Sequence, residues 1–188
     1  MQQFKLIPYL RVDLHRAQFL LSNQTNQQQG VRLWLGLLSP RFAPVLLCRL
    51  AHSMQLLKLS PVAKLFSLVN FFLFGIEIAS RCPIGPGLFF PHTQGTVIGA
   101  WSIGNNATIF QGVTLGATAL DMAYSEYSRP VVGNNVTIGA GAKILGNLRL
   151  DDFSCVGANA VVLSSVVAGG VAVGVPAKVV KINTFKNE

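Results

Sequence analysis

The stretch VGNNVTIGAGAKILGNLRLDDFSCVGANAVV, residues 132–162, repeats with a period of six. Every sixth residue is a branched aliphatic one, and the series is Val132, Ile138, Ile144, Leu150, Val156 and Val162. A helix repeats every 3.6 residues and a strand every two, so neither explains this spacing. A unit of six residues that forms one short strand and one tight turn does explain it. The stretch therefore predicts a solenoid built from hexads.

The hexads are expected to build a triangular prism. Three hexads close one coil of about 18 residues, and the aliphatic residue of each hexad points into the prism. The same position then stacks from coil to coil, as Ile138 on Val156. Glycine and asparagine supply the left-handed turns at the corners. The predicted class is mainly β, a parallel β-helix. Earlier inward-facing positions are Val97, Ile103, Ile109 and Leu115, and before them Ile78, Ile84 and Phe90 in an offset phase.

The first part of the chain lacks this rhythm and is expected to be helical. Residues 9–21 place apolar side chains at helical intervals, and Ser60 before Pro61 predicts a helix that has Ser60 as its cap. We therefore divide the chain into a helical segment, residues 1–75, and a β-helix domain, residues 76–188. The hexad count fails between Leu115 and Val132, which predicts a protruding loop at residues 116–131.

The composition bounds the partners and the compartment. Apolar residues make up 51% of the chain and charged residues 12%, which predicts surface buried between subunits or against a membrane. The net charge is +8, but the sequence has no dense run of Lys and Arg, so we expect no nucleic acid as partner. Three cysteines without metal-ligand spacing predict reduced thiols in a cytoplasmic protein. The apolar stretch 65–79 is too short to span a bilayer, and peripheral contact with the inner face of a membrane is left open.

His92 lies where the hexads change phase. One residue is added between Phe90 and Val97, and such an interruption in a solenoid usually reflects a function or a boundary. The unperturbed pKa of imidazole is about 6.5, which suits a general base that takes a proton from a hydroxyl near neutral pH. From the residues alone, a solvated corner histidine and a catalytic base both remain open.

Four stretches carry a resemblance to a known family: HTQGTVIG at 92–99, IFQGVTLG at 109–116, IGAGAKILGN at 138–147 and GVPAKVV at 174–180. The hexads resemble those of bacterial hexapeptide-repeat transferases, and residues 76–181 resemble the serine acetyltransferase family. The helical segment, with CRLAH at 48–52, resembles relatives from surface-polysaccharide synthesis, of the colanic-acid and capsule type. The resemblance implies a left-handed β-helix and a homotrimer with active sites between subunits.

The resemblance also implies an acyltransferase that uses acetyl-CoA as its acetyl donor. His92 is then the general base, and Glu77, 15 residues earlier, is the carboxylate that orients its imidazole. In a coil of about 18 residues, this spacing brings the two near each other on adjacent layers. No metal site is expected. The residues implied to contact the cofactor are Gly116, Ala140, Ala158 and Lys178, and the residue implied to contact the acceptor is Arg129.

Two departures from the family pattern decide the predicted acceptor. Pro91 stands where serine acetyltransferases carry Asp, and Ser128-Arg129-Pro130 stands where they carry Arg-His-Pro. The ammonium group of a free amino acid needs a carboxylate, and Pro91 cannot supply one. We therefore predict an O-acetyltransferase that acts on a hydroxyl of a sugar or polysaccharide precursor. Serine O-acetylation in cysteine biosynthesis is the alternative, and a non-catalytic β-helix scaffold is a second alternative.

Overall fold

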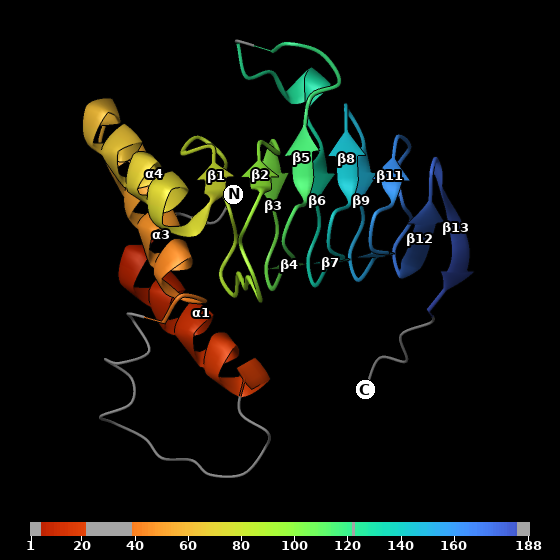
Figure 1. Ribbon diagram of the computed structural model, residues 1–188, viewed down its shortest axis with the longest axis horizontal. Helices are drawn as coiled ribbons and strands as arrows, with labels where there is room; N and C mark the ends of the chain where they lie inside the picture. Colours follow the sequence, from red (N-terminus) through yellow and green to blue (C-terminus); the bar gives the residue numbers. More distant parts are fainter. Residues whose placement is uncertain (1–4, 22–38, 122, 184–188) are drawn as a thin grey trace.

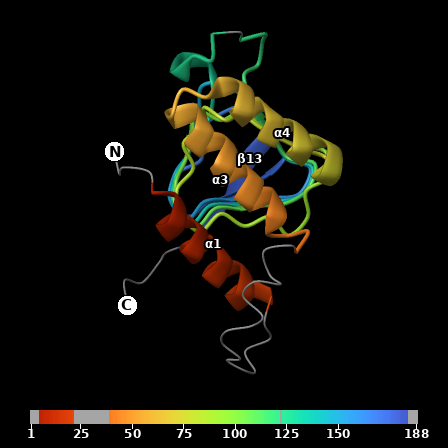
Figure 2. The same cartoon turned by 90° about the vertical axis from the view of Figure 1, so that its left-hand side faces the viewer.

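The computed structural model of the chain describes residues 5–21, 39–121 and 123–183. Residues 22–38 of the predicted helical segment, residue 122 of the predicted loop, and both ends of the chain lie outside the described residues. In the described part of the chain, three helices precede the solenoid and cover one end of it (Figure 1 and Figure 2). They are α1 (Leu6–Leu21), α3 (Ala43–Leu56) and α4 (Ser60–Phe74).

The last helix, α4, differs in detail from its prediction. It begins at Ser60, its N-cap position falls on Leu59, and no side chain caps it. It ends at Phe74, and the C-cap residue Gly75 has a left-handed backbone (φ 62°) and donates its N–H to the carbonyl of Phe71. Strand β1 follows at once, so the chain passes from helix to solenoid within one residue.

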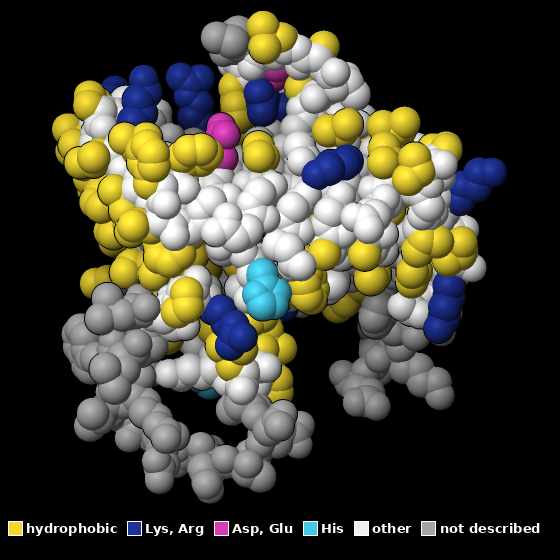
Figure 3. Space-filling view, in the orientation of Figure 1, with side chains coloured by type: hydrophobic (Ala, Val, Ile, Leu, Met, Phe, Trp, Pro, Cys, Tyr) yellow, Lys and Arg dark blue, Asp and Glu magenta, His cyan; other side chains and the backbone are white. Residues whose placement is uncertain are grey.

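The helical part leaves much apolar surface uncovered. Figure 3 shows hydrophobic side chains gathered over the helices, and α4 alone exposes Leu65, Phe72 and Leu73 by 57%, 74% and 67%. In the described residues, no helix has the length and hydropathy that crossing a membrane requires.

Within residues 76–121 and 123–183, three sheets form the walls of the solenoid, and they are parallel except for the last pair of strands. The first sheet contains β1 (Ile76–Ile78), β2 (Thr96–Ile98), β5 (Thr114–Gly116), β8 (Lys143–Leu145) and β11 (Val161–Val162). The second contains β3 (Ser102–Ile103), β6 (Val131–Val132) and β9 (Arg149–Leu150). The third contains β4 (Thr108–Ile109), β7 (Thr137–Ile138), β10 (Cys155–Val156), β12 (Gly170–Gly174) and the antiparallel β13 (Ala177–Ile182). The predicted parallel β-helix after a helical N-terminal part is confirmed.

The hexads fill the prism as predicted, with one exception. Ile138 pairs with Val156 in adjacent coils, and all six aliphatic positions from 132 to 162 are at most 2% exposed. Val97, however, is 37% exposed, and Ile98 takes the inward position at 1%. The prediction for Val97 was wrong because the turn that contains His92 is longer than a single added residue, so the inward positions run from Phe90 to Ile98.

A buried ion pair fastens the helices to the first coil. Arg49 in α3 donates from Nε and Nη2 to the two carboxylate oxygens of Asp13 in α1, at 2.9 and 3.0 Å. The same carboxylate accepts the backbone N–H groups of Gly87 and Leu88, at 2.6 and 2.9 Å. Arg49 Nη2 also donates to the carbonyl of Gly85, at 2.7 Å. Because the carboxylate and guanidinium are almost fully buried, each needs these partners to offset its desolvation.

Candidate active site

The turn that carries His92 connects the third sheet to β2 and is tied to the start of β1. The Thr93 hydroxyl donates to the carbonyl of Phe74 at 2.7 Å, and the N–H of Gly95 donates to the carbonyl of Gly75 at 2.9 Å. His92 itself is exposed. Within the described residues its imidazole makes no hydrogen bond, so the ring is available to a ligand or to a neighbouring chain.

The same corner recurs in each following coil and forms a continuous edge. The residues at equivalent positions, which we call the turn column, are Gln94, Gln111, Ala140 and Ala158. Each precedes a residue of positive φ, and these are Gly95 (71°), Gly112 (70°), Gly141 (74°) and Asn159 (56°). Backbone hydrogen bonds of 2.8–3.0 Å join successive layers: Gly112 N–H to Gln94, Gly141 N–H to Gln111, and Asn159 N–H to Ala140.

Two predicted cofactor residues therefore lie on the edge that begins at His92. Ala140 and Ala158 occupy adjacent layers. The layer before Ala140 contains Gln111, and the layer before that contains the turn of His92. Layers of a parallel sheet are about 4.8 Å apart. A ligand extended along Ala158 and Ala140 thus points its end toward the turn of His92.

Glu77 lies in the middle of β1, in register with Val97. Its expected position near His92 assumed a coil of about 18 residues, but the first coil is longer: Ile76 is in register with Thr96, 20 residues later. Both side chains are exposed, and in the part of the chain that the structure describes no hydrogen bond or ion pair joins them. The catalytic pair of His92 and Glu77 stays a prediction.

The other two predicted cofactor residues lie elsewhere on the solenoid. Gly116 ends β5, at the far end of the strand from the turn column, where its carbonyl accepts the N–H of Gly146 at 2.9 Å. Lys178 lies in β13 opposite Val173, in the hairpin that closes the solenoid, and its side chain is exposed. The structure of this chain thus does not bring either of them to His92.

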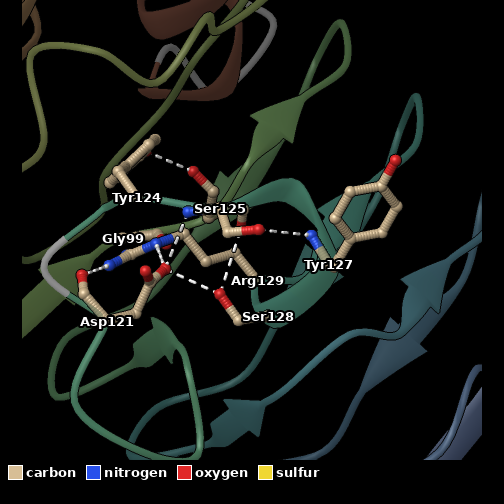
Figure 4. A network of polar contacts seen from close by, with 8 residues as sticks. Gly99, Asp121, Tyr124, Ser125, Tyr127, Ser128 and Arg129 are labelled. Carbon is tan, nitrogen blue, oxygen red and sulfur yellow. Dashed lines mark hydrogen bonds and ion pairs between the residues drawn. The ribbon is translucent and has the colours of Figure 1, made fainter.

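Arg129 is held inside the loop that follows β5 (Figure 4). Its Nε donates to Asp121 at 2.8 Å, Nη1 donates to the carbonyl of Gly99 at 2.7 Å, and Nη2 donates to the carbonyl of Asp121 at 3.1 Å. The guanidinium also lies over the ring of Tyr124, 4.1 Å from its centroid. The Arg129 side chain is only 13% exposed, so its clearest role in the structure is to fasten the loop to the coil.

Asp121, which was not among the predicted site residues, anchors the loop. It accepts the Ser128 hydroxyl at 2.6 Å and the Ser125 N–H at 2.9 Å, besides Arg129. These donors, the Ser128 hydroxyl foremost, lower the pKa of Asp121 to about 2. The signal in the sequence was an acid eight residues before an arginine within one predicted loop, which allows an ion pair across the loop.

A groove of about 600 Å³ lies elsewhere, between the helices and the second sheet. Its lining includes Tyr9 and His52 from the helices and Tyr124 from the loop. Ser102 in β3 and the preceding Trp101 also line it. It does not include any residue of the turn column. Within the described residues, no group of three or more His, Cys, Asp or Glu could hold a metal ion.

Comparisons with known proteins give one consistent result. A serine acetyltransferase from Helicobacter pylori is 42% identical over 145 residues, which is 77% of this chain and 83% of that protein. The solved structure of Neisseria gonorrhoeae serine acetyltransferase in complex with serine superposes with a TM-score of 0.78, at 30% identity, over 94% of this chain and 69% of that chain.

A second solved structure, a serine acetyltransferase from Brucella abortus in complex with coenzyme A, has a TM-score of 0.80 at 28% identity. It covers 95% of this chain and 69% of that chain. No model of a protein family matches the sequence.

Proposed function

Because the chain belongs to the serine acetyltransferase family and is an acyltransferase, we propose that it transfers the acetyl group of acetyl-CoA to the hydroxyl of serine. The observation that carries the proposal is the 42% identity, over 77% of the chain, to a serine acetyltransferase. The two solved relatives in complex with serine and with coenzyme A support the same pair of ligands.

The prediction of a sugar or polysaccharide precursor as acceptor is wrong. The matched relatives are serine acetyltransferases, and nothing among them supports the surface-polysaccharide branch. That prediction rested on two departures from the family pattern, Pro91 in place of Asp and Ser128-Arg129-Pro130 in place of Arg-His-Pro. Two departures are weak ground, because an ammonium group can also be bound by other carboxylates or by carbonyl oxygens of the site.

The turn column suits the extended arm of acetyl-CoA. Ala140 and Ala158 have small side chains, so a chain-like ligand can lie flat along the edge and reach backbone groups there. The net charge of +8 favours an anionic ligand. Bound there, acetyl-CoA supplies an acetyl group activated as a thioester. The predicted cofactor contacts of Gly116 and Lys178 belong to the same proposal. Neither residue lies at the turn column of its own chain, so we propose that a neighbouring subunit contributes these two residues.

His92 supplies the acid–base chemistry in this proposal. Its neutral imidazole takes the proton of the serine hydroxyl, so that the oxygen can attack the acetyl carbon as the bond to sulfur breaks. The imidazolium then returns that proton to the departing sulfur. Glu77 would hold the imidazole in one tautomer, and Arg129 would contact the acceptor.

Transfer in one step is favoured over a route through an acetylated cysteine. Cys48 and Cys82 are buried free thiols, and burial raises the pKa of Cys48 to about 11 and that of Cys82 further. Cys155 is also a free thiol, in β10, away from the turn of His92. A thiol with a raised pKa is a poor nucleophile at neutral pH.

The assembly belongs to the proposal as well. We propose a cytoplasmic homotrimer of left-handed β-helices, each with a helical segment (residues 1–75) and a transferase domain (residues 76–188). Exposed apolar side chains on the solenoid, such as Leu163 (56%) and Val167 (50%), support contacts between copies. Light scattering of the purified protein tests this part: a mass of three chains is expected, and a monomer would contradict it.

The activity is tested by mixing the purified full chain with acetyl-CoA and L-serine and following free thiol. We expect CoA release that depends on serine, and O-acetylserine as the product by mass spectrometry. A parallel panel of sugars should give only the background rate. If neither serine nor any sugar of the panel gave CoA release, the result would favour a β-helix scaffold without catalysis. CoA release with a sugar but not with serine would contradict the proposal.

A further inference from the structure

The side-chain oxygen Oε1 of Gln111 is buried and accepts no hydrogen bond. A buried carbonyl oxygen without a partner has lost its hydrogen bonds to water and gained none in return, so such an atom calls for an explanation. Two more atoms of this kind occur in the described residues, Asn70 Oδ1 and Ser154 Oγ. Those two belong to residues that are only 2% and 1% exposed, enclosed in the helical part and the prism. Gln111 is only half-buried, so its amide can reach the surface by rotation of its side chain.

Gln111 occupies a particular place on the edge of the solenoid. It is the member of the turn column between the turn of His92 and the layer of Ala140. The N–H of Gly141 in the next layer donates to the backbone carbonyl of Gln111 at 2.8 Å. One layer is about 4.8 Å, so the Gln111 amide stands roughly one layer from Ala140 on the side of the imidazole. A ligand that runs from Ala158 to His92 must pass it.

The other glutamine of the column has a different task. A Cβ atom built on Gly75 would lie 2.0 Å from Oε1 of Gln94. The Gln94 side chain therefore fills the space above Gly75, at the junction of α4 and β1. The Gln111 side chain does not fill a space of this kind. Among the described residues, its oxygen also has no hydrogen-bond partner.

The arm of acetyl-CoA supplies the matching group. Close to the thioester it carries a secondary amide, whose N–H is a donor without an acceptor once the arm leaves water. We propose that Gln111 Oε1 accepts a hydrogen bond from this amide N–H and so positions the thioester beside His92. The inference rests on the proposed function, which supplies the ligand and its direction along the turn column. Gln111 acts here as a positioning residue, because it does not contact the reacting atoms.

The test is the substitution Gln111→Met, which keeps the length of the side chain and removes the acceptor. Coenzyme A, which carries the same amide, is titrated into the full chain by calorimetry without serine. The dissociation constant is expected to rise about tenfold, the size of one net hydrogen bond. The melting temperature of the free protein is expected to stay the same or rise, because an unpaired buried oxygen has been removed.

Weaker coenzyme A binding together with an unchanged or higher melting temperature distinguishes a role in binding from a structural role. A Gln111 that merely supported the coil, or that paired with a neighbouring subunit, would lower the melting temperature or dissociate the assembly when replaced. Either of those results overturns the inference, as does a dissociation constant within twofold of the wild type. The matched control is Gln18→Met, the same substitution at an exposed position of α1, which should change neither quantity.

The outcome is also separable from the proposed function. Coenzyme A binding is measured without an acceptor, so a wild type that binds it but fails to acetylate serine refutes the acceptor and leaves Gln111 testable. A wild type that acetylates serine, with unchanged coenzyme A binding in Gln111→Met, refutes the role of Gln111 alone. In the variants, the KM for serine should stay at its wild-type value.

Discussion

The later coils of the solenoid and its first coil are built from the same hexad but differ in regularity. From β6 to β11 every pairing advances by 18 residues, as Thr137 with Cys155 and Lys143 with Val161. The first coil advances by 20, from Ile76 to Thr96, and the next by 17, from Val97 to Thr114. A constant register lets like residues stack, whereas the irregular coil projects His92 out of the wall. Regular coils thus supply stability, and in the proposed mechanism the irregular coil supplies the catalytic histidine.

The largest effect is expected in the irregular coil. Replacing His92 by Ala should lower kcat for serine by about 10²–10⁴, the usual contribution of a general base. The melting temperature should not change, because the side chain is exposed. Thiol release and thermal unfolding measure the two quantities. The control is His15→Ala, an exposed histidine of α1. Equal loss of activity in both variants, or near-normal activity of His92→Ala, would remove His92 from the mechanism.

The junction between the helices and the first coil should be the next most sensitive. Arg49→Ala leaves the buried Asp13 carboxylate without its cation, and a break of this kind costs about 3–5 kcal/mol. Urea unfolding measures the loss. The matched control is Arg149→Ala, whose ion pair with Asp151 is exposed and should contribute at most about 1 kcal/mol. Similar losses in the two variants would mean that the helices are not fastened by this pair.

Within the regular coils, inward and outward positions should respond differently. Ile144→Ala opens a cavity at a fully buried position and should cost about 2–5 kcal/mol of unfolding free energy. Val97→Ala, at the outward position of β2, should cost no more than about 0.5 kcal/mol. Chemical denaturation of the two variants tests the corrected register. If Val97→Ala proved the more damaging, the inward series would not pass through Ile98.

The smallest effect concerns the loop and its dependence on pH. The pKa of Asp121 is lowered in the folded state from its ordinary value of 3.8 to about 2. A depressed carboxyl pKa stabilises the fold above pH 3.8, and this contribution is lost as the pH falls through about 2. The tyrosine and tryptophan signals of the loop and Trp101 should therefore change in that window. In Asp121→Asn the window should disappear, and a persistent transition there would assign it to another group.

The sequence alone predicted the walls of the solenoid well, since a core position imposes the same demand on every coil. Ile138, Ile144 and Val156 repeat because each must fill the same space, and a period of six records that demand. The length of the turn at His92 cannot be predicted from the period, because an exposed turn does not require a particular residue type at each position. That is why Val97 was placed inward and why the expected approach of Glu77 to His92 assumed too short a coil.

The candidate site was predictable only in part. The resemblance to the family implied roles for His92, Ala140 and Ala158, and the structure places the two alanines in the turn column. The ion pair of Asp121 and Arg129 depends on how one loop folds back on itself, and spacing does not encode that. The prediction of the acceptor failed because two departures from the family pattern, at Pro91 and at residues 128–130, were taken to decide the specificity of a site that many groups build.

The central claim is that the edge of the solenoid marked by the turn column carries the active site. A crystal structure of the full chain with coenzyme A bound tests it most directly. The account predicts the pantetheine arm along Ala158 and Ala140, with the sulfur directed past Gln111 to the imidazole of His92. An arm seated instead in the groove lined by Tyr9, Trp101 and Tyr124 would contradict it.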